Sequence, residues 1–248
     1  PNIGECWAGG TATFMILGDV CTRSCGFCAI KTGRPTWLDE GEPERVAEAI
    51  AKLNLRHAVI TSVNRDELPD GGAAIFARTI RAVHARCENT SVEVLIPDFQ
   101  GNWDALEHVL AAAPEILNHN LETVPRLYRV MRPQARYGRS LELLDRARQI
   151  GPAPTKSGMM LGAGETRQET EQSIRDLAGV GCRILTLGQY LSPSAQHVQV
   201  DRFVHPDAFV ELRDFALALG FGHVESGPMV RSSYHAERQV DDMIAAGP

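Results

Sequence analysis

Three cysteines near the start of the chain have a spacing suited to metal binding. Cys21, Cys25 and Cys28 follow the pattern C-x3-C-x2-C. This clustering is too tight for the disulfide framework of a chain of 248 residues, whereas thiolates are soft ligands that suit zinc or an iron–sulfur cluster. Structural zinc needs a fourth protein ligand, and none lies nearby in the sequence. A [4Fe–4S] cluster bound by three cysteines leaves one iron open, so we expect an iron–sulfur cluster here.

The overall composition is that of an ordinary globular protein, with 44% hydrophobic and 23% charged residues. A net charge of −6 argues against nucleic acid as a partner, because phosphate binding needs a basic surface. No segment approaches the roughly 18 consecutive apolar residues of a membrane span, and no secretory signal is present. The clustered thiols therefore indicate a reducing compartment, namely the cytoplasm, or a mitochondrion or plastid in a eukaryote. Since the chain opens on Pro1, we expect it to be trimmed or incompletely represented.

Five arginines crowd into fourteen residues, against the acidic balance of the whole chain: Arg126, Arg129, Arg132, Arg136 and Arg139. Two interpretations stay open. The arginines form either a solvated helix face or a docking surface for an acidic partner or a carboxylate.

Short apolar runs alternate with amphipathic stretches along the chain. Six runs are predicted as buried strands, at residues 13–18, 57–63, 92–97, 116–121, 157–161 and 184–187. Apolar residues at helical spacing predict helices around residues 46–53, 76–87 and 209–219. Thr166 and Glu169 have the capping-box spacing that begins another helix. No composition shift marks a boundary, so we predict one domain over residues 1–248.

Strands that alternate with helices predict parallel βαβ units, so the predicted fold class is α/β. A barrel is favoured over an open sheet, and we expect a partial (βα)6 TIM-like barrel. Such barrels place their chemistry at the C-terminal ends of the strands. Polar residues collect at these predicted ends: Cys21, Asn64, Arg65, Asp66, Asp98, Asn118, His119, Asn120, Glu122, Glu165, Gln189 and Tyr190.

The cysteine motif resembles that of the radical S-adenosylmethionine superfamily, C-x3-C-x-Φ-C, and Phe27 occupies the apolar or aromatic position Φ. The resemblance implies that the open iron binds the amino and carboxylate groups of S-adenosylmethionine. An electron from the cluster then splits the sulfonium and releases a 5′-deoxyadenosyl radical. The protein would position the reactants, deliver the electron and exclude quenchers.

Further matches to the superfamily follow the later strands. Residues 158–165 resemble a G-x-I-x-G-x-x-E motif that shapes the adenine pocket, with Met160 in place of Ile, and Asn120 and Glu122 resemble a polar pair that meets the ribose or methionine part. Alternatively, glycines before a capped helix are a common turn device, and polar strand ends often bond locally. Six residues are assigned to S-adenosylmethionine binding: Phe27, Asn120, Glu122, Gly162, Glu165 and Gln189.

Blocks spread over the chain resemble the lipoyl synthase family in particular. They are P-N-I-G-E-C-W (1–7), G-T-A-T-F-M-I-L-G (10–18), R-D (65–66) with D-G-G (70–72), P-D-F (97–99), N-H-N-L-E (118–122), T-K-S (155–157), G-Q-Y-L (188–191) and R-S-S-Y-H (231–235). The resemblance implies insertion of two sulfur atoms, at C6 and C8, into an octanoyl chain on a lysine of a lipoyl carrier protein. It also implies two [4Fe–4S] clusters, one that cleaves S-adenosylmethionine and an auxiliary one that donates sulfur.

In that family the auxiliary cluster is bound by a C-x4-C-x5-C motif and a serine of the R-S-S-Y segment. Cys6 matches the third cysteine, and the first two would precede Pro1, so we expect an N-terminal segment outside this sequence. Ser233 matches the serine, with Ser232 as the alternative. Residues 1–12 and 222–248 are then extensions at the barrel mouth. The implied metal ligands are Cys6, Cys21, Cys25, Cys28 and Ser233, of which all but Cys6 are also predicted as catalytic.

The resemblance also implies partners. These are octanoylated lipoyl carrier domains, such as those of the 2-oxoacid dehydrogenase E2 subunit and the glycine cleavage H protein, and an electron donor such as ferredoxin or flavodoxin. Because such carriers are acidic around the modified lysine, the resemblance favours the docking interpretation of the arginines.

Two other functions stay open. The nearer is a biotin-synthase-like sulfur inserter acting on a free small molecule, against which the R-S-S-Y tail and the P-N-I-G-E-C start argue. The more distant is a non-catalytic metal or electron-transfer module, against which the size and the polar strand ends argue. Cys87 and Cys182 are predicted as inert packing, and His119 and His235 as candidates for lining the site. The remaining singled-out histidines are predicted as structural: His57, His84, His108 and His223.

Overall fold

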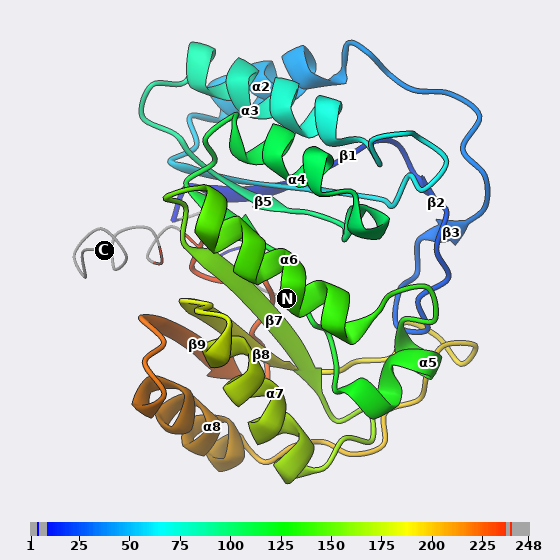
Figure 1. Ribbon diagram of the computed structural model, residues 1–248, viewed down its shortest axis with the longest axis vertical. Helices are drawn as coiled ribbons and strands as arrows, with labels where there is room; N and C mark the ends of the chain where they lie inside the picture. The colour runs from blue at the N-terminus through cyan, green and yellow to red at the C-terminus, as the bar shows by residue number, and fades with distance from the viewer. Residues whose placement is uncertain (1–3, 5–8, 237–238, 240–248) are drawn as a thin grey trace.

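The computed structural model describes residue 4, residues 9–236 and residue 239 of the chain. Within these residues, seven parallel strands form one sheet in the order β1-β4-β5-β6-β7-β8-β9 (Figure 1). They are β1 (Thr11–Ile16), β4 (His57–Ser62), β5 (Ser91–Leu95), β6 (Ile116–Asn118), β7 (Thr155–Leu161), β8 (Ile184–Gln189) and β9 (His223–Gly227). In the part of the chain that the structure describes, β1 and β9 do not pair, so the barrel is open between them.

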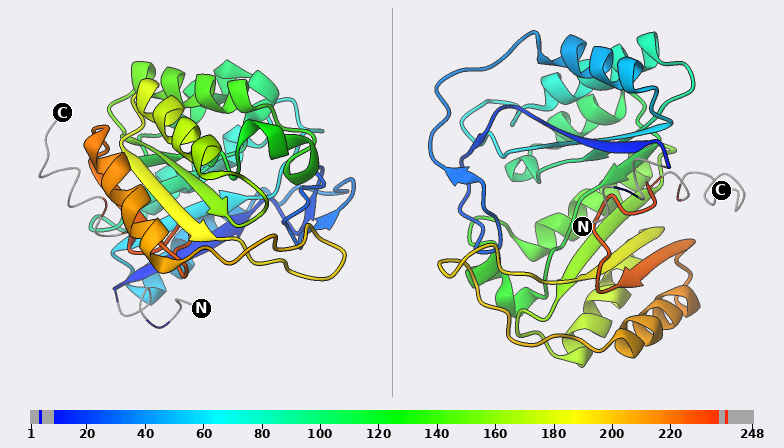
Figure 2. Two further views of the ribbon diagram at one scale, coloured as in Figure 1. Left: turned by 90° about the horizontal axis from the view of Figure 1, so that it is seen from below. Right: turned by 180° about the vertical axis from the view of Figure 1, so that it is seen from behind.

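Helices cover the outer face of the curved sheet (Figures 1 and 2). They are α2 (Glu42–Leu53), α3 (Ala73–Arg86), α4 (Trp103–Leu110), α5 (Tyr128–Met131), α6 (Tyr137–Ile150), α7 (Arg167–Gly179) and α8 (Pro206–Ala218), with the 3-10 turns η1 (Phe99–Gly101) and η2 (Pro125–Leu127). The inner face of the sheet is left to side chains that point into the barrel.

The main core lies between the sheet and its helices. Val92 and Val94 on β5 belong to it, as do Phe76 and Ile80 on α3, all fully buried. Burying side chains of this size contributes roughly 1.5–3 kcal/mol each, so this layer holds the strands in place. Side chains alternate along a strand, so Glu93 between the two valines points to the opposite, inner face. The interior of the barrel is therefore polar in part.

The predicted α/β class, the parallel strand–helix units and the partial barrel are confirmed. All six predicted strands are present, although β1 and β7 begin two residues earlier than expected. The capping box of Thr166 and Glu169 is also present at the start of α7.

The predicted strand count was wrong by one. β9 pairs with β8 in parallel, so residues 223–227 belong to the sheet and not to a C-terminal extension. The sequence H-V-E-S-G has one apolar side chain, and only Val224 is buried, because an edge strand has just one neighbour to pack against. Without an apolar run, the strand had no pattern by which to be predicted.

A second, two-stranded sheet was also not predicted. β2 (Val20–Cys21) pairs in parallel with β3 (Lys31–Thr32), so that Val20 lies opposite Lys31 and Cys21 opposite Thr32. Two residues per strand are too few for a periodic pattern. The pairing brings together the two ends of the segment that contains the motif cysteines, and we call residues 21–28 the cysteine loop.

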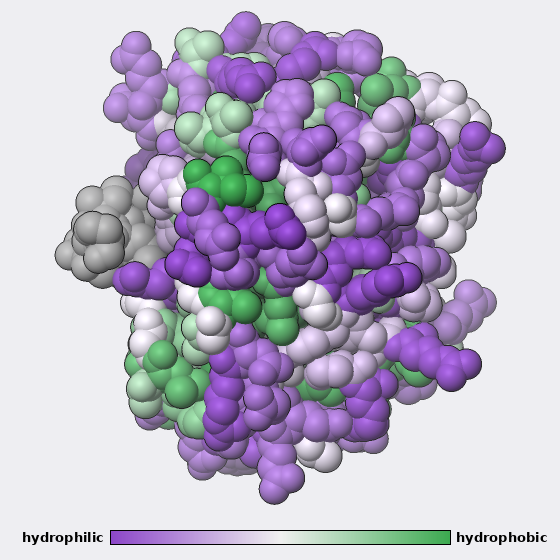
Figure 3. Space-filling model, viewed as in Figure 1, coloured by the Kyte–Doolittle hydropathy of each residue, from purple (hydrophilic) through white to green (hydrophobic). Residues whose placement is uncertain are grey.

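The chain after β9 turns back into the opening between β1 and β9 (Figure 2, right). On the opposite side of the molecule, the surface over the helices is largely hydrophilic, with small apolar patches (Figure 3). Among the described helices, none combines the length and the apolar character needed to cross a membrane.

Candidate active site

The motif cysteines line one pocket at the C-terminal ends of the strands. The pocket encloses about 810 Å³, including space open to solvent, and the segments after β4, β5 and β6 complete its wall. It brings together six of the predicted site residues: Cys21, Cys25, Phe27, Cys28, Asn120 and Glu122. Residues more than 90 positions apart in the sequence thus share one cavity because parallel strands end at the same edge of the sheet.

Backbone hydrogen bonds hold the cysteine loop between two other segments. The Gly26 amide donates to the Met131 carbonyl at 2.9 Å, and the Val198 amide donates to the Gly26 carbonyl at 2.9 Å. A Cβ at Gly26 would lie 2.6 Å from a backbone oxygen and 2.8 Å from Val198 Cγ2, so a larger residue would displace one neighbour. His197 Nε2 also lies 3.1 Å from the Cys28 carbonyl oxygen. The segment that follows β8 therefore fastens the cysteine loop from outside.

Each cysteine has a different surrounding. The Cys21 sulfur, at the end of β2, accepts weak hydrogen bonds from the amides of Arg23 and Asn64 at 3.4 and 3.3 Å. Burial raises the pKa of Cys25 to about 11, with the Arg132 guanidinium opposing it, and burial also raises the pKa of Cys28. Because metal binding needs thiolates, loading this site would release protons.

Asn120 and Glu122 form the wall of the pocket that follows β6. The Asn120 Nδ2 group donates to Glu122 Oε1 at 3.1 Å, while Asn120 Oδ1 is buried without a hydrogen-bond partner in the described structure. Burial raises the pKa of Glu122, and the Arg132 cation opposes that shift. A buried polar atom without a partner is uncommon in folded proteins, and here it belongs to a residue that lines the pocket, which suits a polar ligand.

Arg132 supplies a positive charge to the same pocket. It is only 9% exposed, and it donates to the carbonyl oxygens of Asn120 at 2.7 Å and Leu121 at 3.0 Å. Arg132 is therefore neither on a solvated helix face nor on a surface that could dock a protein partner, although it can still meet a carboxylate in the pocket. Its clustering with other arginines in the sequence concealed this role, because nothing local to the sequence distinguishes a buried arginine from its exposed neighbours.

The other arginines of the cluster divide into two groups. Arg126 pairs with Glu169 at 2.7 Å, and Arg139 pairs with the buried Asp98 at 3.2 Å. The other two are exposed and form no ion pair with any described residue: Arg129 and Arg136. The five side chains thus do not form one continuous basic surface.

A second pocket continues from the first along the inner face of the barrel, and Asn120 and Glu122 line both. Two glycines in its wall allow close packing of the protein around it. A Cβ at Gly158 would lie 2.5 Å from the Thr186 hydroxyl, and a Cβ at Gly188 would lie 2.2 Å from a backbone oxygen. Any side chain at these positions would thus displace the neighbouring segments that form the pocket wall.

The C-terminal segment closes the far side of this second pocket. Arg231 and Ser232 line it, whereas Ser233 lies half-buried beside it and is not among the lining residues. The structure therefore brings Ser232 to the pocket wall, and the role of Ser233 stays a prediction. Cys6, the other predicted ligand of the auxiliary cluster, lies outside the described residues.

Glu165 and Gln189 use their polar atoms on the protein itself. The Glu165 carboxylate accepts the Gly162 amide at 2.8 Å and pairs with Arg202 at 2.7 Å. Gln189 donates to the Arg202 carbonyl at 3.1 Å and accepts the Val204 amide at 2.9 Å. Gly162 has φ +100°, where a Cβ would be strained and would lie 2.3 Å from Gln189 Nε2. These residues shape the backbone beside the pocket.

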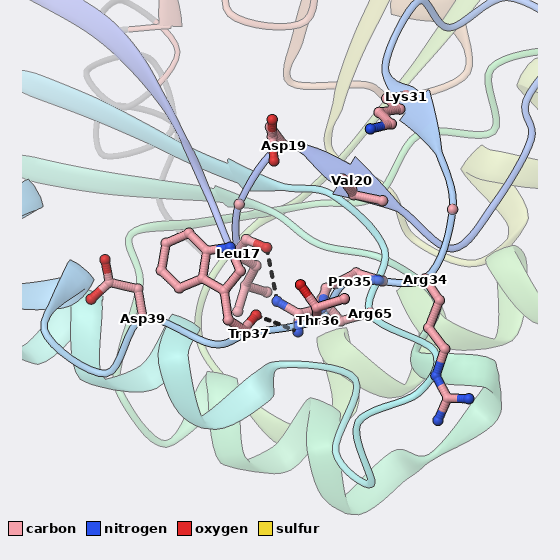
Figure 4. A pocket seen from close by; sticks show the side chains of 12 residues that line it. Leu17, Asp19, Val20, Lys31, Arg34, Pro35, Thr36, Trp37, Asp39 and Arg65 are labelled. Atoms are coloured by element: carbon pink, nitrogen blue, oxygen red, sulfur yellow. Dashed lines mark hydrogen bonds between the residues drawn. The ribbon is translucent and has the colours of Figure 1, made fainter.

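Another pocket lies on the outer side of the cysteine loop, between residues 17–20, the β2–β3 pair and residues 33–39 (Figure 4). Arg65, which is buried, joins its two sides by donating to the carbonyls of Leu17 at 2.9 Å and Trp37 at 3.1 Å. Arg65 was predicted at the rim of the site. The structure gives it a supporting position there, and it is the next residue, Asp66, that contacts the cysteine loop.

The remaining singled-out residues are held by local contacts. His119 is buried, with Nδ1 2.8 Å from the Ile96 carbonyl oxygen and Nε2 2.9 Å from Ser140 Oγ, and burial lowers its pKa to about 4. It lines the cysteine pocket as a neutral imidazole. Cys182 is buried, and Cys87 is half-buried at the end of α3. All the cysteines that the structure describes are free thiols.

The arrangement fits the expected cofactors. Among the described residues, no three Cys, His, Asp or Glu side chains converge as a single ion requires. Such convergence is what structural zinc needs, whereas a four-iron cluster meets each thiolate with a different iron and accepts a wider spacing. The soft thiolates suit iron, and the unpartnered Asn120 Oδ1 with the Glu122 carboxyl and the Arg132 guanidinium suits a zwitterionic ligand beside it.

Comparisons with known proteins agree with this site. Residues 15–177 match the model of the radical SAM superfamily. The chain is 60% identical to a lipoyl synthase of Roseiflexus sp. (strain RS-1), over 97% of this chain and 80% of that protein. It is 58% identical to a lipoyl synthase of Rubrobacter xylanophilus, over 98% of this chain and 76% of that protein.

Solved structures show the same fold at low sequence identity. Methylornithine synthase superposes with a TM-score of 0.63 at 13% identity, over 96% of this chain and 84% of that chain. The FeFe-hydrogenase maturase HydG from Carboxydothermus hydrogenoformans gives 0.65 at 15% identity, over 94% and 65%. Streptococcus suis SuiB, solved bound to S-adenosylmethionine, gives 0.66 at 10% identity, over 90% and 53%.

Proposed function

This chain belongs to the lipoyl synthase family within the radical SAM superfamily, and we propose that it inserts two sulfur atoms, at C6 and C8, into an octanoyl chain carried on a lysine of a lipoyl carrier protein. The observation that carries the proposal is the 60% identity over 97% of the chain. The shared pocket of Cys21, Cys25 and Cys28 at the strand ends supports it.

In this proposal Cys21, Cys25 and Cys28 ligate three irons of a [4Fe–4S] cluster and leave the fourth to S-adenosylmethionine. Together, the bound cluster and S-adenosylmethionine supply a carbon-centred radical, which can remove hydrogen from an unactivated C–H bond where no basic side chain can. The task of the chain is to hold the thiolates, orient the cofactor and keep water out. The bonds of Gly26 to Met131 and Val198 support the first of these roles.

The pocket beside the cysteines would receive S-adenosylmethionine. The Glu122 carboxyl and the Arg132 guanidinium both line it, which suits an amino group and a carboxylate, and Asn120 Oδ1 has no hydrogen-bond partner among the described residues. An ammonium group near Glu122 would offset the burial that raises the pKa of its carboxyl. Phe27 packs with a small apolar cluster that includes Tyr190. Gly162 and Glu165 would act through the backbone that they hold, whereas Gln189 both holds backbone and lines the second pocket.

For the auxiliary cluster we propose Cys6 and Ser233 as ligands, with the residues before β1 and the segment after β9 as the extensions that carry them. The position of the adjacent Ser232 in the wall of the second pocket supports this assignment, since it brings the R-S-S-Y segment close to the site. Serine is a hard ligand for iron, which suits a cluster that must come apart when it gives up sulfur.

The proposed partners are acidic lipoyl carrier domains, such as those of the E2 subunit and the H protein, with ferredoxin or flavodoxin as electron donor in the cytoplasm. Arg129 and Arg136, exposed and without an ion pair among the described residues, are the docking candidates that remain. Reversing both to Glu is expected to slow turnover of a carrier domain at low salt and to spare turnover of a short octanoyl-lysine peptide. Equal turnover of the carrier by the variant and the wild type would contradict this docking assignment.

The function is tested by anaerobic reconstitution with iron and sulfide, followed by S-adenosylmethionine, a reductant and an octanoyl-lysine peptide. The expected products are 5′-deoxyadenosine and thiolated peptide. A Cys25→Ala variant should give neither, and a matched Cys87→Ala control should give both, because Cys87 lies at the end of α3 away from the pocket. In protein that carries every ligand of the auxiliary cluster, deoxyadenosine without thiolated peptide would contradict sulfur insertion, and the absence of deoxyadenosine would contradict the radical chemistry altogether.

A further inference from the structure

Arg23 lies inside the cysteine motif, between Cys21 and Cys25, and its side chain is almost fully buried. Its guanidinium bridges two carboxylates. Nε lies 2.7 Å from Asp66 Oδ2, while Nη2 lies 2.8 Å from Asp66 Oδ1 and 2.5 Å from Asp98 Oδ1. No function described above uses this side chain, although it belongs to the loop that carries the metal ligands.

The two carboxylates are fixed to the barrel by other contacts. Asp98 is fully buried, accepts the Gln100 amide at 3.1 Å and pairs with Arg139 on α6 at 3.2 Å. Asp66 accepts a hydrogen bond from the Thr22 hydroxyl at 3.1 Å, a second contact with the cysteine loop. Asp66 follows β4 and Asp98 follows β5, so both acceptors lie in segments that leave the sheet at the mouth of the barrel.

The geometry suits arginine specifically. A guanidinium is planar and presents several donors in a fixed fork, so it can pair with Asp66 through two nitrogens while reaching Asp98 with one of them. A lysine in its place would supply one ammonium and would not satisfy both carboxylates with the same geometry. Each bond lies between the loop and a strand end, and none of them involves a cysteine sulfur.

We propose that Arg23 is a positioning residue that holds the cysteine loop in its cluster-binding form even when no metal is bound. The proposal rests on the cluster assigned to Cys21, Cys25 and Cys28. Because the bonds of Arg23 run to carboxylates and not to a metal, they persist when a cluster is lost. The thiols then stay arranged for a new cluster to assemble without refolding of the loop.

The test is the reactivity of individual thiols in the reduced, metal-free full chain. Wild type and Arg23→Gln are treated with iodoacetamide, and the alkylation of each cysteine is followed by mass spectrometry. Loss of the bridge is expected to raise the rates at Cys25 and Cys28 by roughly ten-fold, because the loop opens more often. The buried Cys182 reports global unfolding, and its alkylation rate should rise much less than those of Cys25 and Cys28. A matched Arg213→Gln control removes an exposed pair with Asp214 and should behave as wild type.

Unchanged rates at Cys25 and Cys28 in Arg23→Gln would overturn the proposal. So would a parallel rise at Cys182, because that would make Arg23 a residue of general stability. If Arg23→Gln does not fold, Asp66→Asn weakens the same bridge at its more exposed carboxylate and is judged by the same criteria.

A second measurement separates positioning from a purely structural role. In reconstituted protein, the reduction potential of the cluster should shift in Arg23→Gln and return part of the way in Arg23→Lys, since lysine keeps the charge and loses the fork. An unshifted potential would contradict the proposal. The alkylation experiment needs neither a cluster nor a substrate, so its outcome does not depend on whether the chain inserts sulfur.

Discussion

Two buried carboxylates in this protein form ion pairs in different parts of the barrel. Glu93, inside the barrel on β5, lies 2.9 Å from Lys156 Nζ on β7, and Asn118 on β6 donates to it at 2.9 Å. Asp98, at the mouth of the barrel, lies 2.5 Å from Arg23 Nη2. Both carboxylates are fully buried. They differ in what their cations belong to, since Lys156 is part of a strand and Arg23 is part of a loop.

The electrostatic balance is similar in the two regions. Burial alone would raise the pKa of each carboxyl, but Lys156 holds the pKa of Glu93 at about 2, and Arg23 holds that of Asp98 at about 2. Each carboxylate is therefore charged at neutral pH. The comparison shows that two similar buried ion pairs have different structural roles. The Glu93 pair joins three strands to one another, whereas the Asp98 pair joins a ligand-bearing loop to the strands.

The largest expected effect comes from breaking the interior pair. Lys156→Met leaves the Glu93 carboxylate buried without its cation, which should lower the free energy of unfolding by about 3–5 kcal/mol. Urea denaturation of the metal-free protein measures this loss. Because the whole fold weakens, the alkylation rates of Cys25, Cys28 and Cys182 should rise together.

Replacing both interior partners is the control for that variant. The double variant Glu93→Leu/Lys156→Met removes both charges of the pair together. It should recover most of the stability that Lys156→Met loses, because neither charge is left without its partner. A double variant as unstable as Lys156→Met alone would show that packing, not charge, dominates at this position.

The next largest effect is expected in the pH dependence of the unfolding free energy, to which the Glu93–Lys156 pair contributes. The pKa of Glu93 lies below its ordinary value of 4.5, so its stabilisation is complete above that pH and is lost as pH falls toward about 2. A shift of this size corresponds to about 3 kcal/mol over that interval. The unfolding free energy of the Glu93→Leu/Lys156→Met double variant should therefore fall less steeply than that of wild type between pH 4.5 and 2. If the unfolding free energies of the double variant and the wild type, measured by urea denaturation, fell equally over this pH range, the low pKa assigned to Glu93 would be contradicted.

The sequence predicted the regions of the molecule unequally, for physical reasons. Six strands were predicted because their apolar runs record burial on both faces, whereas β9 lacks such a run and β2 and β3 are too short to show one. The cysteine pocket was predicted in outline because its ligand spacing is local. Its supports were not, because Arg23 and Asp98 are 75 positions apart and only the fold brings them together.

For Arg132, the sequence pattern was present but predicted the wrong environment. Its position in a run of arginines favoured a surface role, yet it is buried beside the cysteines and bonded to backbone carbonyls. Local composition indicates charge, but burial depends on the fold, which brings the C-terminal end of α5 against the cysteine loop and the pocket. A sequence pattern therefore identifies the groups that do chemistry more readily than the groups that position them.

A smaller effect is expected from breaking the pair at the mouth. Asp98→Asn keeps the shape of the side chain but removes the charge that faces Arg23 and Arg139, and it should cost about 2 kcal/mol of unfolding free energy. The alkylation rates of Cys25 and Cys28 should rise more than that of Cys182. Equal increases at all three thiols would mean that the Asp98 pair, like the Glu93 pair, stabilises the whole fold and not the cysteine loop in particular.

The smallest expected effect concerns His119, which lies between the two regions and close to Asp98, Arg132 and Arg23. Burial lowers its pKa to about 4, so the folded protein keeps the imidazole neutral while the unfolded chain takes up a proton as pH falls below about 6.5. Its stabilisation is therefore complete well above pH 6.5 and declines toward pH 4, by about 1 kcal/mol between pH 6.5 and 5.5. In urea denaturation, His119→Gln should lose the hydrogen-bond contribution at every pH but show a flatter slope between pH 6.5 and 5.5. A slope equal to that of wild type would mean that His119 becomes protonated in the folded protein, and a charged imidazole would then lie in the wall of the cysteine pocket.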